Sequence, residues 1–328
     1  MEGKSEPAIR LASSVGRWLP TPGSGRTADR WHALSALAVG DLTAARVAEA
    51  HTDALAILAE AATDRAAGEV PVAAVGATDD STWGVFAAEG PGVKVTARSD
   101  GDRWFLTGIK PWCSLAGSLS HALITAHTPG GARRLFAIDL RTSSVQVAEG
   151  SWMARGLVEV PSGPIELTDC PAVPVGPDRW YLTRSGFAWG GIGVAACWFG
   201  GAVGLARTLR EALTVREPDQ IATMHLGAVD VALVNARAML AAAATAVDGG
   251  AAIGADGVLL ALRVRSTVAR AAEDVIARVG HTLGPAPLAM DERHARRVAD
   301  LQLYLRQHHA ERDESALGRQ VLDLQDWL

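Results

Sequence analysis

The spacing of the apolar residues changes twice along the chain, and this order of patterns constrains the fold most. From Trp31 to Arg65 the apolar residues recur at helical spacing. From Val70 to Val175 they alternate at strand spacing, in seven or eight short runs separated by turn residues. From Asp178 onward long Ala- and Leu-rich stretches return to the helical period. Because strands and helices are segregated, an alternating βαβ nucleotide-binding sheet is excluded.

This pattern predicts an α+β multidomain fold with three parts. We expect a short N-terminal helical domain over residues 1–68, a β-barrel middle domain over 69–177 and a C-terminal antiparallel helical bundle over 178–328. Residues 1–30 mix charges with Ser, Pro and Gly and are expected to be an irregular lead-in. Asp41 is placed to cap the second N-terminal helix. The short runs expected as strands include residues 157–160, and the bundle helices are expected at 184–215, 224–247, 255–280 and 291–309.

One stretch reaches the length of a membrane span. Residues 185–206 hold 22 positions without a formal charge, seven of them glycine. The Gly200-x-x-x-Gly204 spacing is found where membrane helices pack closely, but a helix buried in a soluble bundle has the same composition. Because no second stretch accompanies it and its flanks lack an aromatic and basic belt, we predict burial in the bundle and no membrane insertion.

The charge balance favours small-molecule chemistry. The chain has 31 Lys and Arg against 36 Asp and Glu, a net charge of −5, and no basic block that would capture nucleic acid. Its three cysteines form no C-x-x-C pair, so neither a disulfide framework nor a zinc cluster is indicated, and a cytoplasmic location is expected. The spacing of Glu49, His51 and Asp53 places them on different faces of a helix, so no metal site is predicted.

Three collinear segments carry a resemblance to a known family. They read DRWFLTGIKPWCS at residues 102–114, WMARGLVEVPSGPIELTDCPAVPVG at 152–176 and GAVGLA at 201–206. Over about residues 45–310 the chain resembles the acyl-CoA dehydrogenase family of flavoproteins. The resemblance implies an FAD-dependent oxidoreductase that acts on a CH–CH group of an acyl thioester in fatty acid metabolism. It also implies a homodimer or homotetramer, because the family shares its cofactor between subunits.

The resemblance also implies which residues of the barrel domain hold FAD. Trp112 and Ser114 match the family's aromatic wall and hydroxyl donor beside the flavin. Thr78 and Ser81 lie in the loop that matches the family's small-residue flavin loop, although two aspartates replace small residues there. The alternatives are that Trp112 is an ordinary core aromatic and that the other three residues only form turns.

Two further positions are implied in the C-terminal part. Arg216 lies where the family contacts the FAD pyrophosphate of the neighbouring subunit, but the Phe-Gly pair that follows in the family is missing. Gly280 and His281 match a turn that lies against the adenosine. A helix end with solvated charges explains Arg216 equally well, and a helix C-cap explains the turn.

The chain departs most from the family at the catalytic base. The family removes the α-proton of its substrate with a glutamate, and here Leu305 or Arg306 stands at that position. The alternative family position falls near Ala195 and Ala196. An arginine is a poor proton acceptor at neutral pH because its pKa stays above about 12.

Three interpretations remain open at this stage. His308 or His309 could act as the base, since an imidazole titrates near neutral pH. The chain could instead be a flavin-dependent monooxygenase of the same superfamily, or a catalytically inactive scaffold. As an alternative to catalysis, both histidines could interact with the end of a charged helix.

Overall fold

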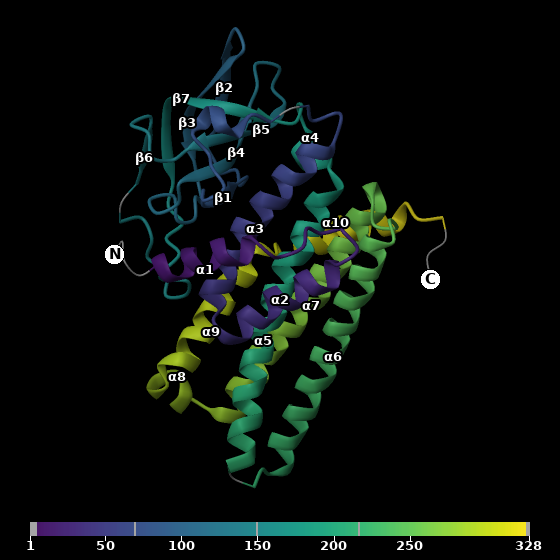
Figure 1. Ribbon diagram of the computed structural model, residues 1–328. Coiled ribbons are helices and arrows are strands. Elements are labelled where there is room, and N and C mark those ends of the chain that lie inside the picture. The colour runs from purple at the N-terminus through teal and green to yellow at the C-terminus, as the bar shows by residue number, and fades with distance from the viewer. Residues whose placement is uncertain (1–4, 69, 149, 216, 326–328) are drawn as a thin grey trace. The chain divides into compact units, whose positions relative to one another are not determined.

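The computed structural model describes residues 5–68, 70–148, 150–215 and 217–325 (Figure 1). Its contacts divide the chain into two compact units. The first, called the β unit, comprises Met1–Leu19, Val47–Met153 and Val158–Phe187. The second, called the helical unit, comprises Pro20–Arg46, Ala154–Leu157 and Ala188–Leu328.

The strands of the β unit close into a barrel. The sheet order is β1-β4-β2-β3-β7-β5, and β5 returns to pair with β4, while β6 adds to β7. Strands β4, β2, β3, β7 and β5 therefore form a closed ring, while β1 and β6 each pair with one strand of it, β4 and β7 respectively. The strands are β1 (Trp83–Phe86), β2 (Val95–Asp100), β3 (Arg103–Lys110), β4 (His121–His127), β5 (Arg133–Asp139), β6 (Val145–Val147) and β7 (Ile165–Val175).

The core of the β unit lies between the barrel and a long helix. Strand β4 is buried along almost its whole length, and the residues between its two terminal histidines are apolar except for Thr125. Helix α3 (Leu42–Thr63) contributes Ile57 to the same core, and short α4 (Trp180–Thr183) contributes Trp180. The unit also contains α1 (Glu6–Gly16) and the 3-10 turn η1 (Val72–Val75).

Two local expectations are wrong. Residues 6–16 form helix α1, because Ile9, Ala12 and Val15 fall on one buried face. Residues 157–160 form turns rather than a strand. Leu157 has a positive φ of 48°, and its N–H donates to Asp300 Oδ1 at 2.5 Å, so it is not available to a strand ladder.

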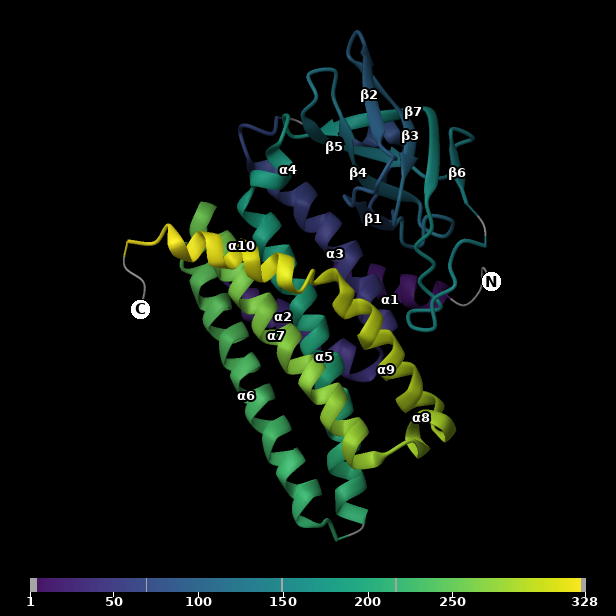
Figure 2. The ribbon, with the colours of Figure 1, turned by 180° about the vertical axis from the view of Figure 1, so that it is seen from behind.

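The helical unit is an antiparallel bundle. Helices α5, α6 and α7 run lengthwise beside one another in both views (Figures 1 and 2). Asp41 Oδ1 accepts from Ala44 N–H at 3.0 Å, which confirms the predicted cap of α3. The remaining bounds are α2 (Thr27–Gly40), α5 (Ser185–Val215), α6 (Gln220–Asp248), α7 (Gly254–Leu283), α8 (Ala286–Met290), α9 (Glu292–Tyr304), η2 (Leu305–Gln307) and α10 (Glu311–Leu322).

The glycines of α5 allow close helix packing. A Cβ at Gly200 would lie 2.2 Å from Ser35 O and 2.7 Å from Ala38 Cβ, so α2 and α5 touch through backbone atoms. By length and composition alone, α5 and α6 are both apolar enough to cross a membrane, so the expectation that no second such stretch accompanies residues 185–206 is wrong. Both belong to the bundle, where 67% of the apolar window of α5 is buried but only 22% of that of α6.

Candidate functional site

The predicted flavin loop follows strand β3, whose last residue is anchored inside the barrel. Lys110 is fully buried and its ammonium donates to Glu89 Oε1 at 2.9 Å and to Thr125 O and Oγ1 at 3.0 and 2.8 Å. Burial lowers the pKa of Lys110, while the bond to Glu89 opposes this shift. The three bonds fix the point from which the loop leaves the barrel.

Trp112 points outward from this loop on an unfavourable backbone. Its φ is +61° and 61% of the residue is exposed, and Leu115 three residues later also has a positive φ, of 59°. The left-handed region costs roughly 1 kcal/mol or more for residues other than glycine, and such strain is found most often at functional sites. The indole held in this way is a flat apolar surface that is largely open to solvent.

A second loop holds residues 113–115 in place. The pairing uses both backbone and hydroxyl groups, which leaves the loop little freedom to rearrange. Burial raises the pKa of the Cys113 thiol to about 12, so this cysteine is not a nucleophile at neutral pH. The bonds are Cys113 N–H to Gly163 O at 2.9 Å, Leu115 N–H to Pro161 O at 2.8 Å, and a 2.8 Å hydroxyl pair between Ser114 and Ser162.

Thr78 and Ser81 form a tight turn of their own. Thr78 N–H donates to Ser81 Oγ at 2.9 Å, and Ser81 N–H donates back to Thr78 O at 3.0 Å. Ser81 is buried, whereas Thr78 is exposed. The next residue, Thr82, is joined through N–H and hydroxyl bonds to Ser120, which lies in the segment that continues the Trp112 loop.

The predicted adenosine residues lie at the end of α7. Gly280 and His281 belong to the last turn, and the helix is capped by Gly284, which has a φ of +67° and donates to Gly280 O at 2.9 Å. His281 is exposed and its ring contacts that of His225 at 5.9 Å. Arg216 lies outside the described residues.

His308 is buried beside a serine and near a carboxylate. Its Nε2 lies 3.2 Å from Ser266 Oγ and 3.8 Å from Asp313 Oδ2. Burial lowers the pKa of His308 and Asp313 opposes this, so the ring is neutral at pH 7. Serine and carboxylate approach the same ring nitrogen, whereas a hydrolytic triad places them on opposite nitrogens. His309 is exposed, and its ring Nδ1 lies 3.3 Å from Oδ1 of the same Asp313.

The histidine lies against a buried tryptophan. The Trp198 ring centroid is 6.3 Å from that of His308, and its indole N–H is buried without a partner among the described residues. The Arg265 guanidinium lies 4.7 Å above the Trp198 ring and donates to Gly191 O and Gln307 O at 2.8 and 2.7 Å. Arg265 therefore ties the segment before His308 to helix α5.

The helical-unit residues are not brought together. Ser266, which contacts His308, is 15 residues before His281 on the same helix, or about 22 Å along its axis. At the expected base positions, Leu305, Ala195 and Ala196 are buried apolar side chains. Arg306 is ion-paired with Glu273. Neither position supplies a carboxylate.

Several contacts at these sites have no signal in the sequence. Ser162 lies 48 residues from its partner Ser114, and Ser266 lies 42 residues from His308. A buried lysine such as Lys110 usually has an acidic partner, but the spacing of residues in the sequence does not indicate that this partner is Glu89. Within the described ranges no group of three or more His, Cys, Asp or Glu side chains is arranged to hold a metal ion.

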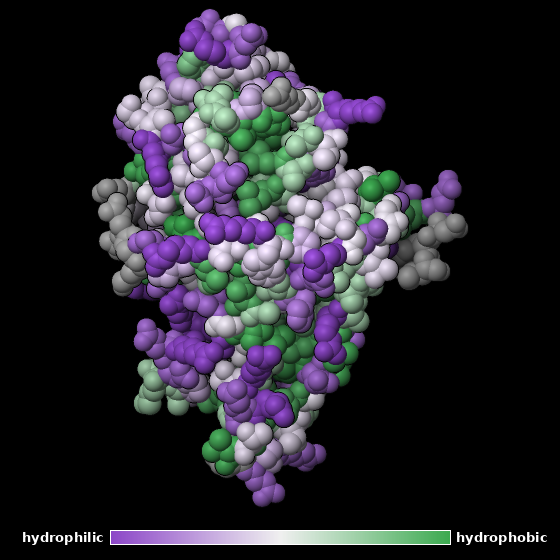
Figure 3. Space-filling model, in the orientation of Figure 1, coloured by the Kyte–Doolittle hydropathy of each residue, from purple (hydrophilic) through white to green (hydrophobic). Residues whose placement is uncertain are grey.

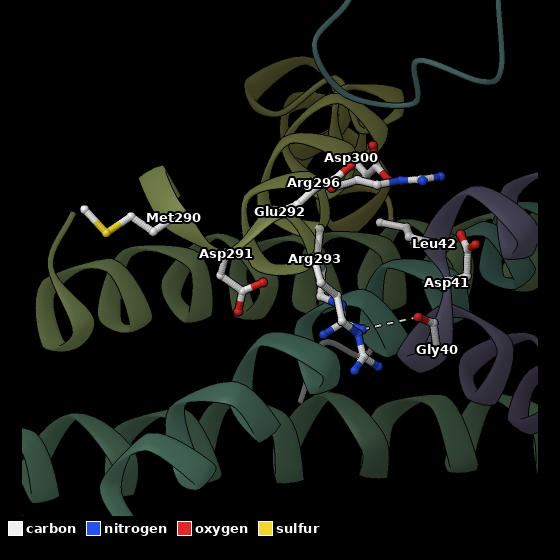
Figure 4. Close-up of a pocket in the computed structure, with 10 residues that line it drawn as sticks. Gly40, Asp41, Leu42, Met290, Asp291, Glu292, Arg293, Arg296 and Asp300 are labelled. Carbon is white, nitrogen blue, oxygen red and sulfur yellow. Dashed lines mark hydrogen bonds and ion pairs between the residues drawn. The ribbon is translucent and has the colours of Figure 1, made fainter. Parts of the chain in front are cut away.

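A separate polar pocket lies within the helical unit (Figure 4). Its volume is about 540 Å³, and Arg293, Arg296 and Asp300 line one side, while the segment from Gly40 to Leu42 lines the other. Burial raises the pKa of Asp300. None of the residues predicted from the sequence as cofactor or catalytic residues lines this pocket.

No family model matches the chain, and no curated protein matches it. Solved structures do match. The nitrososynthase of Micromonospora carbonacea var. africana is 18% identical, with a TM-score of 0.80 over 98% of this chain and 90% of that one. A glutaryl-CoA dehydrogenase from Mycobacterium smegmatis, in complex with FADH2, is 15% identical, with a TM-score of 0.79 over 100% and 90%.

A third match is the dibenzothiophene monooxygenase TdsC from Paenibacillus sp. A11-2, at 16% identity and a TM-score of 0.75 over 97% of both chains. The same enzyme has been solved with FMN and indole. At these identities the likeness shows the fold and not the reaction. The chain has the acyl-CoA dehydrogenase fold, and the predicted order of N-terminal helices, β-barrel and helical bundle is confirmed.

Proposed function

We propose that this chain is a flavin-dependent oxidoreductase that holds the flavin ring against the Trp112 face of the β unit. The observation that carries the proposal is the exposed indole of Trp112 on a left-handed backbone. An isoalloxazine needs a flat apolar wall with a hydroxyl nearby, and the hydroxyl pair of Ser114 and Ser162 lies in the same loop system. The FADH2 and FMN complexes of two fold relatives support this assignment.

A bound flavin would supply reversible hydride or electron chemistry. The protein's share is positioning: the buried Lys110 anchor and the pairing of residues 113–115 with 161–163 keep the indole from collapsing onto the barrel. Ser162 Oγ donates to Val160 O at 2.9 Å, so in the hydroxyl pair it accepts from Ser114, and Ser114 would have to exchange this bond to donate to a carbonyl or ring nitrogen of the flavin. The finer choice of FAD, with Thr78, Ser81, Arg216, Gly280 and His281 as further contacts, stays a prediction from the resemblance.

Among flavin reactions we favour monooxygenation with supplied reduced flavin. Dehydrogenation of an acyl thioester needs a base for the α-proton, and the two expected positions hold Leu305, Arg306 and alanines. Oxygen chemistry on a substrate held beside reduced flavin does not require that carboxylate. The fold relatives include a monooxygenase, which supports this choice.

The second candidate is an acyl-CoA dehydrogenase with a histidine base. His308 supports it because burial keeps its imidazole neutral and able to accept a proton. Its Nε2, however, is directed at Ser266 and Asp313, so a proton would have to pass through the serine hydroxyl. The exposed His309 would act only if the substrate reached its position beside Asp313.

Flavin binding is tested by replacing two equally exposed tryptophans. We expect Trp112→Ala to weaken FAD and FMN binding at least tenfold in a fluorescence titration, because it removes the aromatic wall. Trp18→Ala is the matched control, since Trp18 is 59% exposed in the same unit. If both variants bind flavin like the parent protein, or if the parent protein binds neither flavin, the assignment is wrong and an inactive scaffold is the better interpretation.

The reaction class is tested by the response to oxygen and to acyl-CoA. A monooxygenase supplied with reduced flavin and an aromatic or amino substrate should consume oxygen at an electrode and release substrate that carries one added oxygen atom, whereas free reduced flavin consumes oxygen without forming that product. A dehydrogenase should instead bleach its flavin absorbance when acyl-CoA is added without oxygen. In that case His308→Gln should slow the bleaching, while the amount of flavin bound to the protein stays the same.

We further propose that the protein is a homo-oligomer that pairs through α6. Opposite its buried face, α6 presents an uncharged seam at alternating spacings of three and four residues, the pattern of a coiled-coil contact. Apolar side chains are visible along α6 in Figure 3. Asp230 and Arg237 lie on a different face of α6, away from the seam, so the seam itself carries no charge. The seam comprises Ile221, Met224, Ala228, Val231, Asn235, Ala238 and Ala242.

A further inference from the structure

A second cavity adjoins the pocket of Figure 4 and has an unusual set of charges. It has a volume of about 190 Å³ and lies between helices α5 and α9. It shares Asp291, Arg293 and Arg297 with the larger pocket, so the two spaces border one another at these residues. Arg207 and Glu211 of α5 complete the charged lining.

Arg297 forms the fixed floor of this cavity. It is buried, and its guanidinium donates to Val39 O at 2.6 Å and to Gly204 O at 3.2 Å. A Cβ at Gly204 would lie 2.7 Å from Arg297 Nε, so the glycine makes room for the guanidinium. Burial lowers the pKa of Arg297, and the nearby positive charges of Arg293 and Arg207 lower it further.

The two outer arginines have no partner among the described residues. Arg207 and Arg293 are exposed and form neither a hydrogen bond nor an ion pair in that part of the chain. The cavity holds two carboxylates, but Asp291 accepts from His294 N–H at 3.1 Å and caps α9. Three guanidinium groups therefore share the cavity with only two carboxylates, Glu211 and the helix cap Asp291. The cavity is left with a net positive charge.

His294 is an independent indication that this cavity binds a ligand. Only 2% of this residue is exposed, it lines the same cavity, and its Nδ1 is buried with no hydrogen-bond partner among the residues that the structure describes. A buried polar atom without a partner costs about 1–3 kcal/mol, so such atoms usually face a ligand or water.

We propose that this cavity binds the phosphate group of a phosphorylated small molecule. Arg207 and Arg293 would grip the phosphate oxygens with paired N–H groups, the geometry for which guanidinium is suited. The organic part would extend past Arg293 into the larger pocket, whose volume of about 540 Å³ is in the range of small-molecule sites. The site is separate from the proposed flavin face and does not depend on it.

Binding is tested by calorimetry with the full chain at constant ionic strength. The probes are inorganic phosphate and glycerol 3-phosphate, with sodium chloride as the control salt. We expect both probes to bind and glycerol 3-phosphate to bind at least threefold more tightly, because it also occupies the larger pocket. Equal affinities for the two probes would contradict the role of the larger pocket.

A double variant identifies the residues. The double variant Arg207→Gln/Arg293→Gln should bind both probes at least tenfold more weakly. Arg210 is an exposed arginine on α5 outside the cavity, so Arg210→Gln should leave both affinities unchanged. Because both replaced side chains are exposed, the circular dichroism spectrum and melting temperature should be unchanged. Absence of binding by the parent protein, or unchanged affinity in the double variant, would overturn the proposal.

Discussion

At the scale of single residues, burial sets the chemistry of His51. The imidazole lies on α3, where its Nδ1 accepts from Trp83 N–H at 3.1 Å and so fixes the start of β1. Burial lowers the pKa of His51 to about 4 from the model-peptide value of about 6.5. The folded state therefore contains this residue in the neutral form, and folding releases a proton between these two pH values.

This gives a signed prediction for acid stability. The contribution of neutral His51 is complete above pH 6.5, falls as the pH drops through about 6.5 toward 4, and levels off below that, for a loss of about 3 kcal/mol. Urea unfolding at pH 7, 5.5 and 4 should show that His51→Gln is less pH-dependent than the parent protein. His32→Gln, at an exposed histidine, is the control. If the free energy of unfolding fell by the same amount between pH 7 and pH 4 in both variants, the prediction would be contradicted.

Residue-scale features divide into those that local sequence encodes and those that it does not. The cap at Asp41 was predictable because capping depends on a few consecutive residues. The exposure of Trp112 was not, because a tryptophan between apolar residues is as compatible with a barrel core as with a surface. Its orientation depends on the pairing with residues 161–163, about fifty positions away in the chain.

At the scale of elements, helix packing explains the glycine spacing that first suggested a membrane span. Gly200 lets the backbone of α5 approach that of α2, where Ser35 also donates through Oγ to Ala196 O at 2.7 Å. A side chain at this position would meet backbone atoms, which cannot move aside without shifting a helix. The effect of a glycine-to-alanine substitution on stability should therefore differ strongly from one helix position to another.

Two glycine-to-alanine variants test this packing. Gly200→Ala should destabilise the protein by at least about 2 kcal/mol in urea unfolding, because the added Cβ would lie 2.2 Å from a carbonyl oxygen. Gly318→Ala lies in helix α10 with nothing within 4 Å of the added atom, and should stabilise by about 1 kcal/mol through helix propensity. Similar effects from both variants would show that the approach of α2 and α5 is not tight.

Element types were predictable where the apolar period was sustained. All four bundle helices and seven strand runs follow from period alone, with bundle-helix ends within about five residues. Helix α1 was missed because Ser, Gly and Pro around it are turn formers. Residues 157–160 were wrongly expected to be a strand, since the carboxylate of Asp300, remote in sequence, takes the N–H of Leu157.

At the scale of the whole molecule, the proposed pairing through α6 makes a specific prediction. Val231→Glu places a charge in the middle of the uncharged seam, where a two-fold pair would bring two copies together, so it should lower the oligomeric state. Light scattering coupled to gel filtration measures this. Val147→Glu, at an exposed valine on β6, should leave the mass unchanged. A monomeric parent protein would refute the pairing outright.

The order of helices, barrel and bundle was predictable because it depends on patterns tens of residues long. The surroundings of His308 were less predictable, because its neighbours Ser266 and Asp313 come from different helices. The arginine cavity shows the same limit: Arg207 and Arg297 are 90 positions apart, and no local motif joins them.

The left-handed backbone at position 112 has a consequence for protein engineering. Glycine would adopt that conformation without the steric penalty that a tryptophan has there. Directed evolution for heat tolerance would therefore discard the tryptophan early, whereas a screen for retained cofactor would keep it. The two selections would drive this position toward different amino acids.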